Sequence, residues 1–534
     1  GFLFITDEDG TNYLLGYRGD PTVLTLPDSY NGQSYEIFNY AFDYCYNLTS
    51  VTMGIGVTGV GACAFYHCEA LTNIKTNEKI KNINAYAFAG CLNLTSIKIP
   101  EGVTEMGSGV FASCRNLADI KIPDSVTEMG SDIFAGCSSL TSIVIPNNVE
   151  RLPANMFSRC SSLKSVTLGS SVKYIEPEVF YPCRSLTSIN VDEKNKNYKS
   201  IDGNLYSKDG KIFVQYAGGK KDSSFTVPKG VTEIGSRAFF DCGYLKNVIL
   251  PDGLKSIGYA AFSYCGKLQS INIPNSVTEI SESAFRSCTS LISIVIPDGV
   301  TKIKPWTFYM CESLLSVTIG SGVTEIEGMV FEGCKLVEVI NKSNLEIKKG
   351  EWQVNGSVGA YALYIHNGES KIVEKNGFLF ITDEDGTNYL VGYKGEESNL
   401  TLPESYEGQD YEIYGSAFYG RDGLTSVIIP DRVKKIGGSA FYNCYNLTDV
   451  TIGNGVERIG NNAFRYCSGL KTVTIGSGVT SIGDYAFCEC RELTTVIYNG
   501  TDEQWNNISR GNNCFWRTGS FTVKYKGGEM NLIG

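Results

Sequence analysis

One complete copy of the pattern that decides the fold is LTSIVIPNNVERLPANMFSRCSS, residues 140–162. Within it, Ile143 and Ile145 are separated by a single residue, and Ser142 and Val144 occupy the alternate positions. This period of two predicts a short strand that buries the isoleucines on one face and exposes the other two side chains.

The rest of the copy predicts how the strand ends and how the unit closes. Pro146 ends the strand, because proline cannot donate to a ladder of hydrogen bonds. Val149 and Leu152 form a second inward pair. Phe157 and Cys160 lie in a segment that we expect to close the coil as a turn or a short helical segment.

The phenylalanine of this closing segment recurs in three runs, and within each run the step is constant, as from Phe111 to Phe134 and on to Phe157. A fixed period in the twenties is typical of a solenoid, in which a coil buries its apolar face only by stacking on its neighbours. Cysteine follows the phenylalanine three positions later in fifteen of sixteen copies, and Arg421 replaces it in the other. The sixteen phenylalanines are Phe42, Phe65, Phe88, Phe111, Phe134, Phe157, Phe180, Phe239, Phe262, Phe285, Phe308, Phe331, Phe418, Phe441, Phe464 and Phe487.

Other segments interrupt this period. An insertion between Phe180 and Phe239 contains GNLYSKDGKIFVQYAGG, residues 203–219, whose Asp-Gly pair between apolar alternations predicts a β-hairpin. The opening stretch, GFLFITDEDGTNYLLGYRGD at residues 1–20, returns almost unchanged as GFLFITDEDGTNYLVGYKGE at residues 377–396. We therefore expect each new run of coils to open with a hairpin.

These interruptions suggest a division of the chain. We expect one array over residues 1–345, with hairpins at 1–19 and 203–219, a junction or cap over 346–376, and a second array with its own opening hairpin and C-terminal cap over 377–534. Trp505 and Trp516 are predicted to cover the open core of the last coil, since a solenoid needs caps at its ends.

The unit L-x-x-I-x-I-P-x-x-V-x-x-I-G-x-x-A-F-x-x-C resembles the BspA-like, treponemal-type leucine-rich repeat. Residues 94–114, LTSIKIPEGVTEMGSGVFASC, and 245–265, LKNVILPDGLKSIGYAAFSYC, match it almost position for position. The resemblance implies an α/β-type, strand-dominated solenoid with right-handed coils, a parallel sheet, short turns or helical segments and inserted hairpins. It also implies a non-enzymatic bacterial protein, secreted or on the cell surface, that serves in adhesion.

Charge and hydropathy exclude several classes of partner. The formal net charge is −11, which argues against nucleic acids and anionic membranes as main partners. No stretch of eighteen apolar residues exists, so no membrane span is predicted. Because the sequence starts at Gly1 rather than Met, we expect a signal peptide to have been removed from an extracellular or surface protein.

The eighteen cysteines are the first candidates for chemistry. Neighbours in the repeated column should lie about 5 Å apart, a distance that disulfides tolerate. Stacked side chains, however, all point the same way, and tetrahedral zinc needs ligands that converge from several directions. We therefore predict buried free thiols, and no metal or other cofactor.

Other features that suggest catalysis or ligand binding have simpler structural explanations. Neither His67 nor His366 has partners for acid–base catalysis, and a glycosidase-like carboxylate pair would have to form in three dimensions. A calcium loop that starts at Asp7 needs glycine at its sixth position and glutamate at its twelfth, but these positions hold Asn12 and Arg18, so DEDGTN at residues 7–12 is expected to form a turn. Gly54-x-Gly56-x-x-Gly59 precedes no long helix, so it is not a dinucleotide loop.

The outward positions of the predicted strands form two columns of mostly small, neutral, hydrogen-bonding side chains, which suit a protein or glycan better than a polyanion. We take these columns as the candidate binding face, although they could also be ordinary solvated sheet. The first column contains Ser96, Asp119, Ser142, Ser165, Ser188, Asn247, Ser270, Ser293 and Ser316. The second contains Lys98, Lys121, Val144, Thr167, Asn272, Val295 and Thr318.

A second candidate for recognition is the integrin-type tripeptide Arg18-Gly19-Asp20. Its counterpart in the duplicate is Lys394-Gly395-Glu396, which favours a basic-Gly-acidic turn kept for its shape.

We therefore expect a monomeric surface protein that binds an extracellular protein ligand. The alternative is a polysaccharide-binding module, which exposed aromatic side chains would favour. Five tyrosines lie beside the Phe/Cys segment, away from the predicted strand face: Tyr44, Tyr66, Tyr264, Tyr442 and Tyr466. An intracellular scaffold is a further alternative, and an enzyme is disfavoured.

Overall fold

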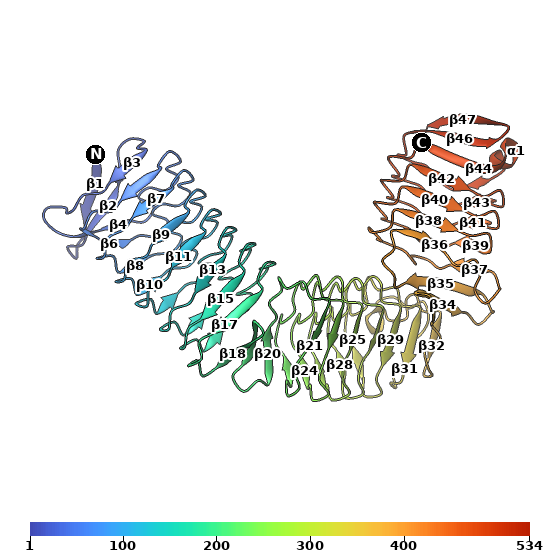
Figure 1. Ribbon diagram of the computed structural model, residues 1–534, viewed down its shortest axis with the longest axis horizontal. Coiled ribbons are helices and arrows are strands. Elements are labelled where there is room, and N and C mark those ends of the chain that lie inside the picture. Colours follow the sequence, from blue (N-terminus) through green and yellow to red (C-terminus); the bar gives the residue numbers. More distant parts are fainter. Residues whose placement is uncertain (534) are drawn as a thin grey trace.

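The computed structural model describes residues 1–533, which form a stack of short coils (Figure 1). In the copy at residues 140–162 the first strand is β13 (Ser142–Val144), the second is β14 (Arg151–Leu152), and a run of turns leads to the next coil. We call the strand before the proline the A strand, the strand after it the B strand, and the segment with Phe and Cys the closing turn.

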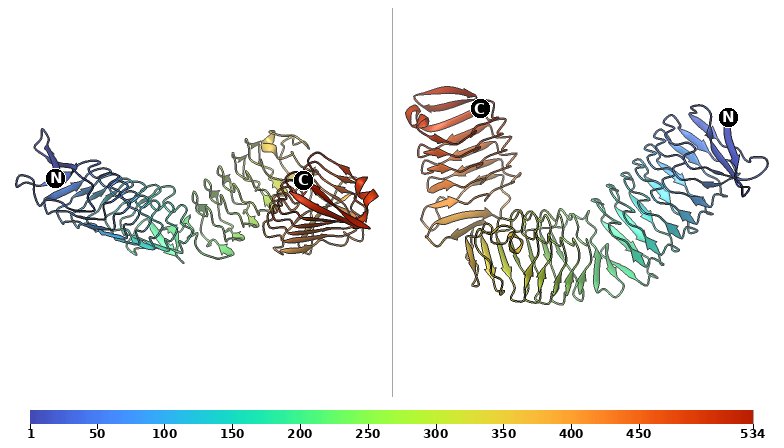
Figure 2. Two further views of the ribbon diagram at one scale, coloured as in Figure 1. Left: turned by 90° about the horizontal axis from the view of Figure 1, so that it is seen from above. Right: turned by 180° about the vertical axis from the view of Figure 1, so that it is seen from behind.

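The coils form three straight stacks, which we call the first arm (residues 1–191), the second arm (198–366) and the third arm (373–533). Figures 1 and 2 show that the arms meet at two bends and together form a U with the chain termini at its tips. The first bend lies between β17 (Ser188–Val191) and β18 (Tyr198–Ile201). The second lies near β32 (Tyr364–His366) and β34 (Phe378–Thr382) (Figure 1).

In the first arm the A strands stack in parallel as three short sheets and the B strands as two, and the first B-side sheet opens with an antiparallel pair. Its A strands are β3 (Val23–Thr25), β5 (Ser50–Thr52), β7 (Asn73–Lys75), β9 (Ser96–Lys98), β11 (Asp119–Lys121), β13, β15 (Ser165–Leu168) and β17. On the B side lie β1 (Phe2–Thr6), β2 (Asn12–Tyr17), β4 (Tyr35–Ile37), β6 (Val57–Val60), β8 (Asn82–Ile83), β10 (Glu105–Met106), β12 (Glu128–Met129), β14 and β16 (Tyr174–Ile175).

The second arm begins with three antiparallel strands, β18, β19 (Asn204–Ser207) and β20 (Ile212–Gln215), on which its B strands continue in parallel. The A strands are β21 (Ser224–Thr226), β23 (Asn247–Ile249), β25 (Ser270–Asn272), β27 (Ser293–Val295), β29 (Ser316–Ile319), β31 (Glu338–Asn341) and β32. The other elements are β22 (Glu233–Ile234), β24 (Ser256–Ile257), β26 (Glu279–Ile280), β28 (Lys302–Ile303), β30 (Glu325–Ile326) and the 3-10 turn η1 (Asn355–Ser357).

The third arm repeats this plan and ends in an antiparallel pair, β46 (Ser520–Lys526) and β47 (Gly528–Ile533). Its other A strands are β36 (Asn399–Thr401), β38 (Ser426–Ile429), β40 (Asp449–Ile452), β42 (Thr472–Ile475) and β44 (Thr495–Thr501). The remaining elements are β33 (Val373–Lys375), β34, β35 (Asn388–Tyr393), β37 (Tyr411–Ile413), β39 (Val433–Ile436), β41 (Arg458–Ile459), β43 (Ser481–Ile482), β45 (Ser509–Arg510) and the helix α1 (Asp502–Asn506).

The closing turns stack their phenylalanine rings inside each arm. The ring centroids of Phe111 and Phe134 are 5.9 Å apart with 7° between the ring planes, and those of Phe441 and Phe464 are 5.1 Å apart with 2°. All four rings are fully buried. The predicted strand-dominated solenoid of stacked parallel coils is therefore confirmed.

Of the two alternatives expected for the closing segment, a turn or a short helical segment, the structure shows the turn. Throughout residues 1–533 the closing segments are turns, and α1 is the only α-helix. The turn is held by bonds to the neighbouring coil, such as the one that the Phe65 N–H donates to the Ala87 carbonyl at 2.8 Å. Such bonds between coils alternate with local turn bonds, such as the one that the Cys68 N–H donates to the Phe65 carbonyl at 3.3 Å, so no continuous helical ladder forms.

The apolar core is divided among the arms. The first core runs from Leu14 to Leu205, so that Leu205 of β19 packs on the first arm. The second core runs from Tyr206 to Ala362 and the third from Phe378 to Val523. A smaller cluster at the second bend joins the second arm to the third. Its members are Leu315, Val337, Tyr364, Leu379, Ile381 and Val391.

The C-terminal cap differs in part from the expectation. Trp505 of α1 is buried against Tyr498, with ring centroids 5.4 Å apart. Trp516, by contrast, is exposed, and the prediction that it covers the core is wrong. Phe521 and Val523 of β46 fill that place, because a strand added to the sheet closes the open end with its own inward side chains.

The glycines that resembled a dinucleotide loop serve coil packing. Strand β6 runs through Gly59, and a Cβ added to Gly54 would collide with the carbonyl oxygen of Pro27. Glycine is therefore required there because two backbones approach closely.

Candidate functional site

The outward residues of the A strands, which we call the A face, lie in register from coil to coil. Ser142 pairs with Ser165 in the parallel ladder, and Val144 pairs with Thr167. The same register joins Ser96 to Asp119. In both outer arms the A strands lie nearer the opening of the U than the B strands do (Figure 1).

Most of the candidate residues are accessible. Ten are exposed: Ser96, Lys98, Asp119, Lys121, Ser142, Val144, Ser270, Asn272, Ser293 and Val295. Five are half-buried: Ser165, Thr167, Ser188, Asn247 and Thr318. The candidates form two separate groups, because the first bend lies between the A strands of the first arm and those of the second.

Ser316 does not belong to the exposed face. Its hydroxyl donates to the Glu338 carboxylate at 2.7 Å, and both side chains are buried. The chain that follows covers this end of the sheet, where the Lys371 N–H and the Ser370 hydroxyl also donate to Glu338. The sequence suggested exposure for Ser316 because the repeat alone gives no sign of this covering segment.

The lysines of the A face are partly neutralised by neighbouring carboxylates. Lys98 forms an ion pair with Glu78, and the Lys121 amino group lies 3.8 Å from the Glu101 carboxylate. The face therefore presents mostly neutral hydrogen-bonding groups, which suits a polar macromolecule better than a polyanion.

The tripeptide Arg18-Gly19-Asp20 lies in an exposed loop after β2. The Asp20 carboxylate accepts a hydrogen bond of 2.6 Å from the Asn47 side chain, which ties the loop to the first closing turn. At the matching position of the third arm, Glu396 forms an ion pair of 2.6 Å with Lys246 of the second arm.

The cysteines of the repeated column are buried packing groups, except for Cys45, which is half-buried. Cys114 donates from its thiol to the carbonyl oxygen of Phe88 at 3.1 Å, and the same bond recurs along each arm. Burial raises the pKa of Cys114 to about 12 and that of Cys160 likewise to about 12. A thiol held neutral in this way is a poor nucleophile.

The structure gives His366 a partner that the sequence did not reveal. Its Nε2 lies 3.2 Å from the buried Glu338 carboxylate, and its Nδ1 accepts a bond from the Gly368 N–H. Both ring nitrogens are therefore occupied, and the nearby Ser370 hydroxyl bonds to Glu338 rather than to the histidine. This arrangement fixes the end of the second arm and activates no nucleophile.

A cavity of about 320 Å³ lies at the first bend, lined by coils from both arms. Glu178 forms an ion pair with Arg237, and Arg184 lies 2.9 Å from the Asp241 carboxylate, so these charges bridge the two arms. Across residues 1–533, no group of three or more potential metal ligands is present here or elsewhere.

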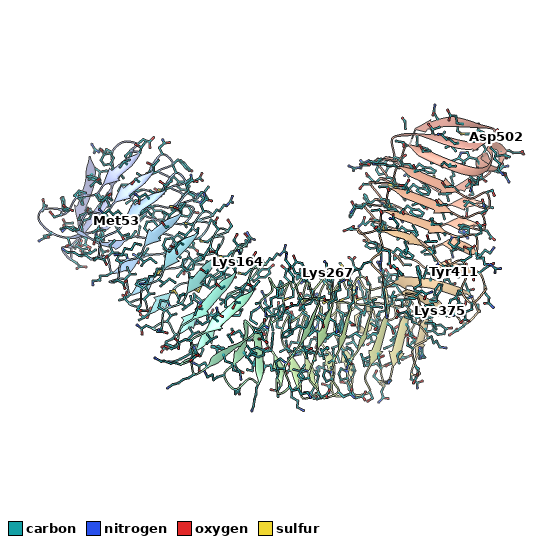
Figure 3. The ribbon with its side chains drawn as sticks, in the orientation of Figure 1. Met53, Lys164, Lys267, Lys375, Tyr411 and Asp502 are labelled. Atoms are coloured by element: carbon teal, nitrogen blue, oxygen red, sulfur yellow. The ribbon has the colours of Figure 1, made fainter. Side chains whose placement is uncertain are left out.

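A larger cavity of about 600 Å³ lies at the second bend. Lys267 on its wall lies on the side of the second arm that faces the opening of the U (Figure 3). The Lys335 amino group lies 3.7 Å from the ring centroid of Tyr419, and burial lowers its pKa to about 8. Arg421 donates to the carbonyl oxygens of Gly395, at 2.7 Å, and Tyr393.

Exposed aromatic side chains gather on the closing turns of the first arm. Tyr44 contacts Tyr66 at 5.5 Å between ring centroids and stacks on His67 at 5.6 Å. Tyr40 is exposed on the first closing turn and Tyr86 on the third. In the third arm Tyr442 contacts Tyr466, whereas Tyr264 of the second arm contacts Phe240. The five tyrosines singled out in the sequence are thus distributed over three arms.

No helix among the described residues has both the length and the apolar character that a membrane crossing requires. The A face, the bend cavities and the tyrosines are surfaces of a β-solenoid, a fold that typically serves as a binding scaffold.

Solved structures of several bacterial proteins are similar to this chain. A leucine-rich cell surface protein from Faecalibacterium prausnitzii is 29% identical, over 67% of this chain and 96% of its own, with a TM-score of 0.49. The leucine-rich repeat protein of Treponema pallidum is 30% identical, over 33% of this chain and 83% of its own, with a TM-score of 0.31. The pneumococcal vaccine antigen PcpA is 17% identical, over 96% of both chains, with a TM-score of 0.36.

Comparison with curated proteins gives no significant match. The family model described as the BspA type leucine-rich repeat region matches in six copies, over residues 35–163, 81–212, 216–338 and 393–522. Most of the chain is covered, and the matched regions contain the stacked A strands, B strands and closing turns described above. The chain therefore belongs to the BspA-type leucine-rich repeat family.

Proposed function

We propose that this protein is a non-enzymatic, secreted or cell-surface bacterial protein that attaches to proteins on host or microbial surfaces. The observation that carries the proposal is the exposed, in-register A face of the first arm. Side chains such as Ser142 and Ser165 repeat there at the spacing of the parallel ladder. A rigid surface of this kind binds an extended partner through many small contacts, as solenoid proteins commonly do.

A binding screen with matched variants tests the proposal. The protein is immobilised and challenged with purified extracellular-matrix proteins and with surface extracts of other bacteria. Ser142→Arg with Ser165→Arg places two long cations on the A face. Thr104→Arg with Thr127→Arg adds the same charge beside exposed B strands of the same arm. We expect saturable binding that the first pair weakens at least tenfold and the second pair leaves unchanged. Equal loss in both pairs, or binding to glycans alone, would contradict the proposal.

The alternative function is polysaccharide binding, and the exposed tyrosines of the first arm favour it. Flat aromatic rings such as Tyr44 and Tyr86 offer apolar faces beside polar hydroxyl groups. A glycan array measures this directly: binding that is lost in Tyr44→Ala with Tyr86→Ala, but kept in the Ser142→Arg pair, would support the alternative.

Several features of the proposal follow from the sequence and stay predictions. They are an extracellular location, a monomeric state, right-handed coils, the division at residues 345 and 376, and the absence of nucleic-acid and membrane partners. Integrin recognition through Arg18–Asp20 also stays a prediction; an Asp20→Ala variant that binds integrin-bearing cells as strongly as the parent would exclude it.

A further inference from the structure

Two nearly identical hairpins have different surroundings in this molecule. Residues 1–20 and 377–396 differ at only three positions, yet the first hairpin opens the first arm and the second is packed into the second bend. Leu3 and Ile5 are 38% and 50% exposed, whereas their counterparts Leu379 and Ile381 are 3% and 0% exposed. The same face is therefore covered in one copy and open in the other.

The covering surface is a distinct column of the second arm. In each coil the residue after the buried leucine and before the A strand points sideways, and we call this position the lateral column. In the second arm it contains Lys246 and Gln269 and then, towards the second bend, Ile292, Leu315 and Val337. Leu315 and Val337 pack directly against the hairpin of the third arm. A Cβ added to Gly392 would lie 3.0 Å from the Leu315 Cδ1, so glycine lets this leucine approach the hairpin closely.

The other arms carry polar or small residues at the lateral position. In the first arm they are Thr49, Thr72, Thr95, Ala118, Thr141, Lys164 and Thr187. In the third arm they are Thr425, Thr448, Lys471 and Thr494. The apolar residues at the lateral position of the second arm thus lie where the hairpin of the third arm docks.

Charged and polar contacts surround the apolar contact. Glu396 pairs with Lys246, which lies in the same lateral column, and Glu384 lies 3.3 Å from the Lys349 amino group. The Tyr364 hydroxyl donates to the Thr382 carbonyl at 2.7 Å. In the open hairpin, Asp20 occupies the position of Glu396 and Glu8 that of Glu384, and both are exposed. The open copy therefore retains both the apolar and the acidic part of the docking face.

The strand pairing at the edge of the hairpin also differs between the two copies. In the covered copy β33 pairs antiparallel with the outer edge of β34. In the open copy β1 pairs only with β2 within the described part of the chain. The apolar side chains of Leu3 and Leu15, which are exposed on this hairpin, favour association with another chain segment.

We propose that the outer face of the first hairpin, formed by Leu3, Ile5 and Leu15 with Glu8 and Asp20 at its rim, is a docking surface for another leucine-rich repeat array. The partner presents apolar side chains at the lateral position of two or three successive coils and lysines near the two acidic residues. A second copy of this chain offers no free column of this kind, since its own third arm already covers Leu315 and Val337.

The test protein carries an added copy of residues 1–376 fused to the N-terminus of the full chain. Asn376 of the added copy is then followed by Gly1 of the full chain, just as Asn376 is followed by Gly377 in the original sequence. Ile5→Val in the outermost hairpin makes its peptides distinguishable by mass. Hydroxyl-radical footprinting then measures Leu3 and Leu15 in both hairpins of one molecule. We expect roughly tenfold slower modification of Leu3 in the inner copy, the ratio of 38% to 3% exposure seen for Leu3 and Leu379.

The matched control is Ile292→Lys with Leu315→Lys in the added unit only, which should abolish that protection. Equal modification of the two hairpins, or protection that persists in the control, would overturn the proposal. Sedimentation of the original chain provides a second measurement, with a monomer expected. Self-association that Leu3→Lys abolishes would identify a second copy as the occupant and would also overturn it.

Discussion

At the scale of single residues, the Phe/Cys pair of the closing turn carries both packing and bonding. Inside an arm the phenylalanine rings stack from coil to coil, as Phe134 does on Phe111 and Phe157, and the thiol of Cys137 donates to the carbonyl oxygen of Phe111 in the previous coil. The sequence predicted burial of the thiols, which the structure confirms for sixteen of eighteen, with Cys45 and Cys63 half-buried. It did not reveal the bond to the neighbouring coil, because that acceptor is a backbone oxygen, which the identity of the side chains does not indicate.

Titration of the buried thiols should destabilise the protein at alkaline pH. The pKa of Cys114 is raised from 9.0 to about 12, so the native thiol stays protonated where the unfolded thiol ionises. Its contribution is complete below pH 9 and declines as the pH rises towards 12; at pH 10 the loss is about 1.4 kcal/mol. The free energy by which Cys114→Ala destabilises the first arm should therefore shrink between pH 7 and pH 10 in denaturant titrations.

The control for this experiment is Val110→Ala, which removes a buried group that does not titrate. Its effect should be the same at both pH values. A Cys114→Ala effect that is also independent of pH would show that the thiol does not titrate differently in the native and unfolded states.

The stacked rings make a second prediction at this scale. Phe134 is fully buried between two rings, each with its centroid 5.9 Å away. Phe134→Ala should lower the free energy of unfolding of the first arm by about 3–5 kcal/mol, because it removes a large buried side chain and leaves a cavity. Phe38→Ala, at an exposed position, should change it by less than about 1 kcal/mol. Urea denaturation followed by circular dichroism distinguishes the two.

At the scale of elements, the hairpins illustrate how one sequence acquires two environments. The return of residues 1–20 at 377–396 was visible in the sequence, and β1 with β2 and β34 with β35 are antiparallel pairs in both places. The apolar residues of the second arm's lateral column were also visible as departures from the repeat. Their role could not be predicted, because it depends on which arm packs beside them.

The two hairpins provide a matched pair of variants. Leu379→Lys with Ile381→Lys places charges in the second-bend cluster, whose apolar side chains each contribute about 1.5–3 kcal/mol by burial. We expect the third arm to detach from the second while both stay folded, seen as a larger radius of gyration in X-ray scattering. Leu3→Lys with Ile5→Lys makes the same change at exposed positions and should leave the radius unchanged. An unchanged radius in both variants would mean that the cluster does not hold the bend.

At the scale of the whole molecule, three cores produce three units of stability. The first core ends at Leu205 and the second begins at Tyr206. The second and third cores are linked mainly by the second-bend cluster. Stability in a solenoid is local, since each coil contacts only its neighbours. The chain should therefore not unfold as one cooperative unit.

Stepwise unfolding can be measured by hydrogen exchange at increasing denaturant concentration. Peptides of the first, second and third arms should lose protection at different midpoints, with coils inside one arm changing together. Leu379→Lys with Ile381→Lys should change the difference between the unfolding midpoints of the second and third arms. It should leave the midpoint of the first arm unchanged. A single midpoint for all three arms would contradict the division of the core.

The sequence by itself determined the coil: the constant repeat period fixes which side chains point inward, and parallel stacking follows because a single coil cannot bury them. It also located the A face, since outward positions alternate with buried ones. Only the tertiary structure decided where the arms bend, that Ser316 is covered, that Trp516 is exposed and that one hairpin face is buried while its twin is open. The physical reason is range: burial within a coil depends on residues one repeat apart, whereas these outcomes depend on segments that meet only after whole arms have formed.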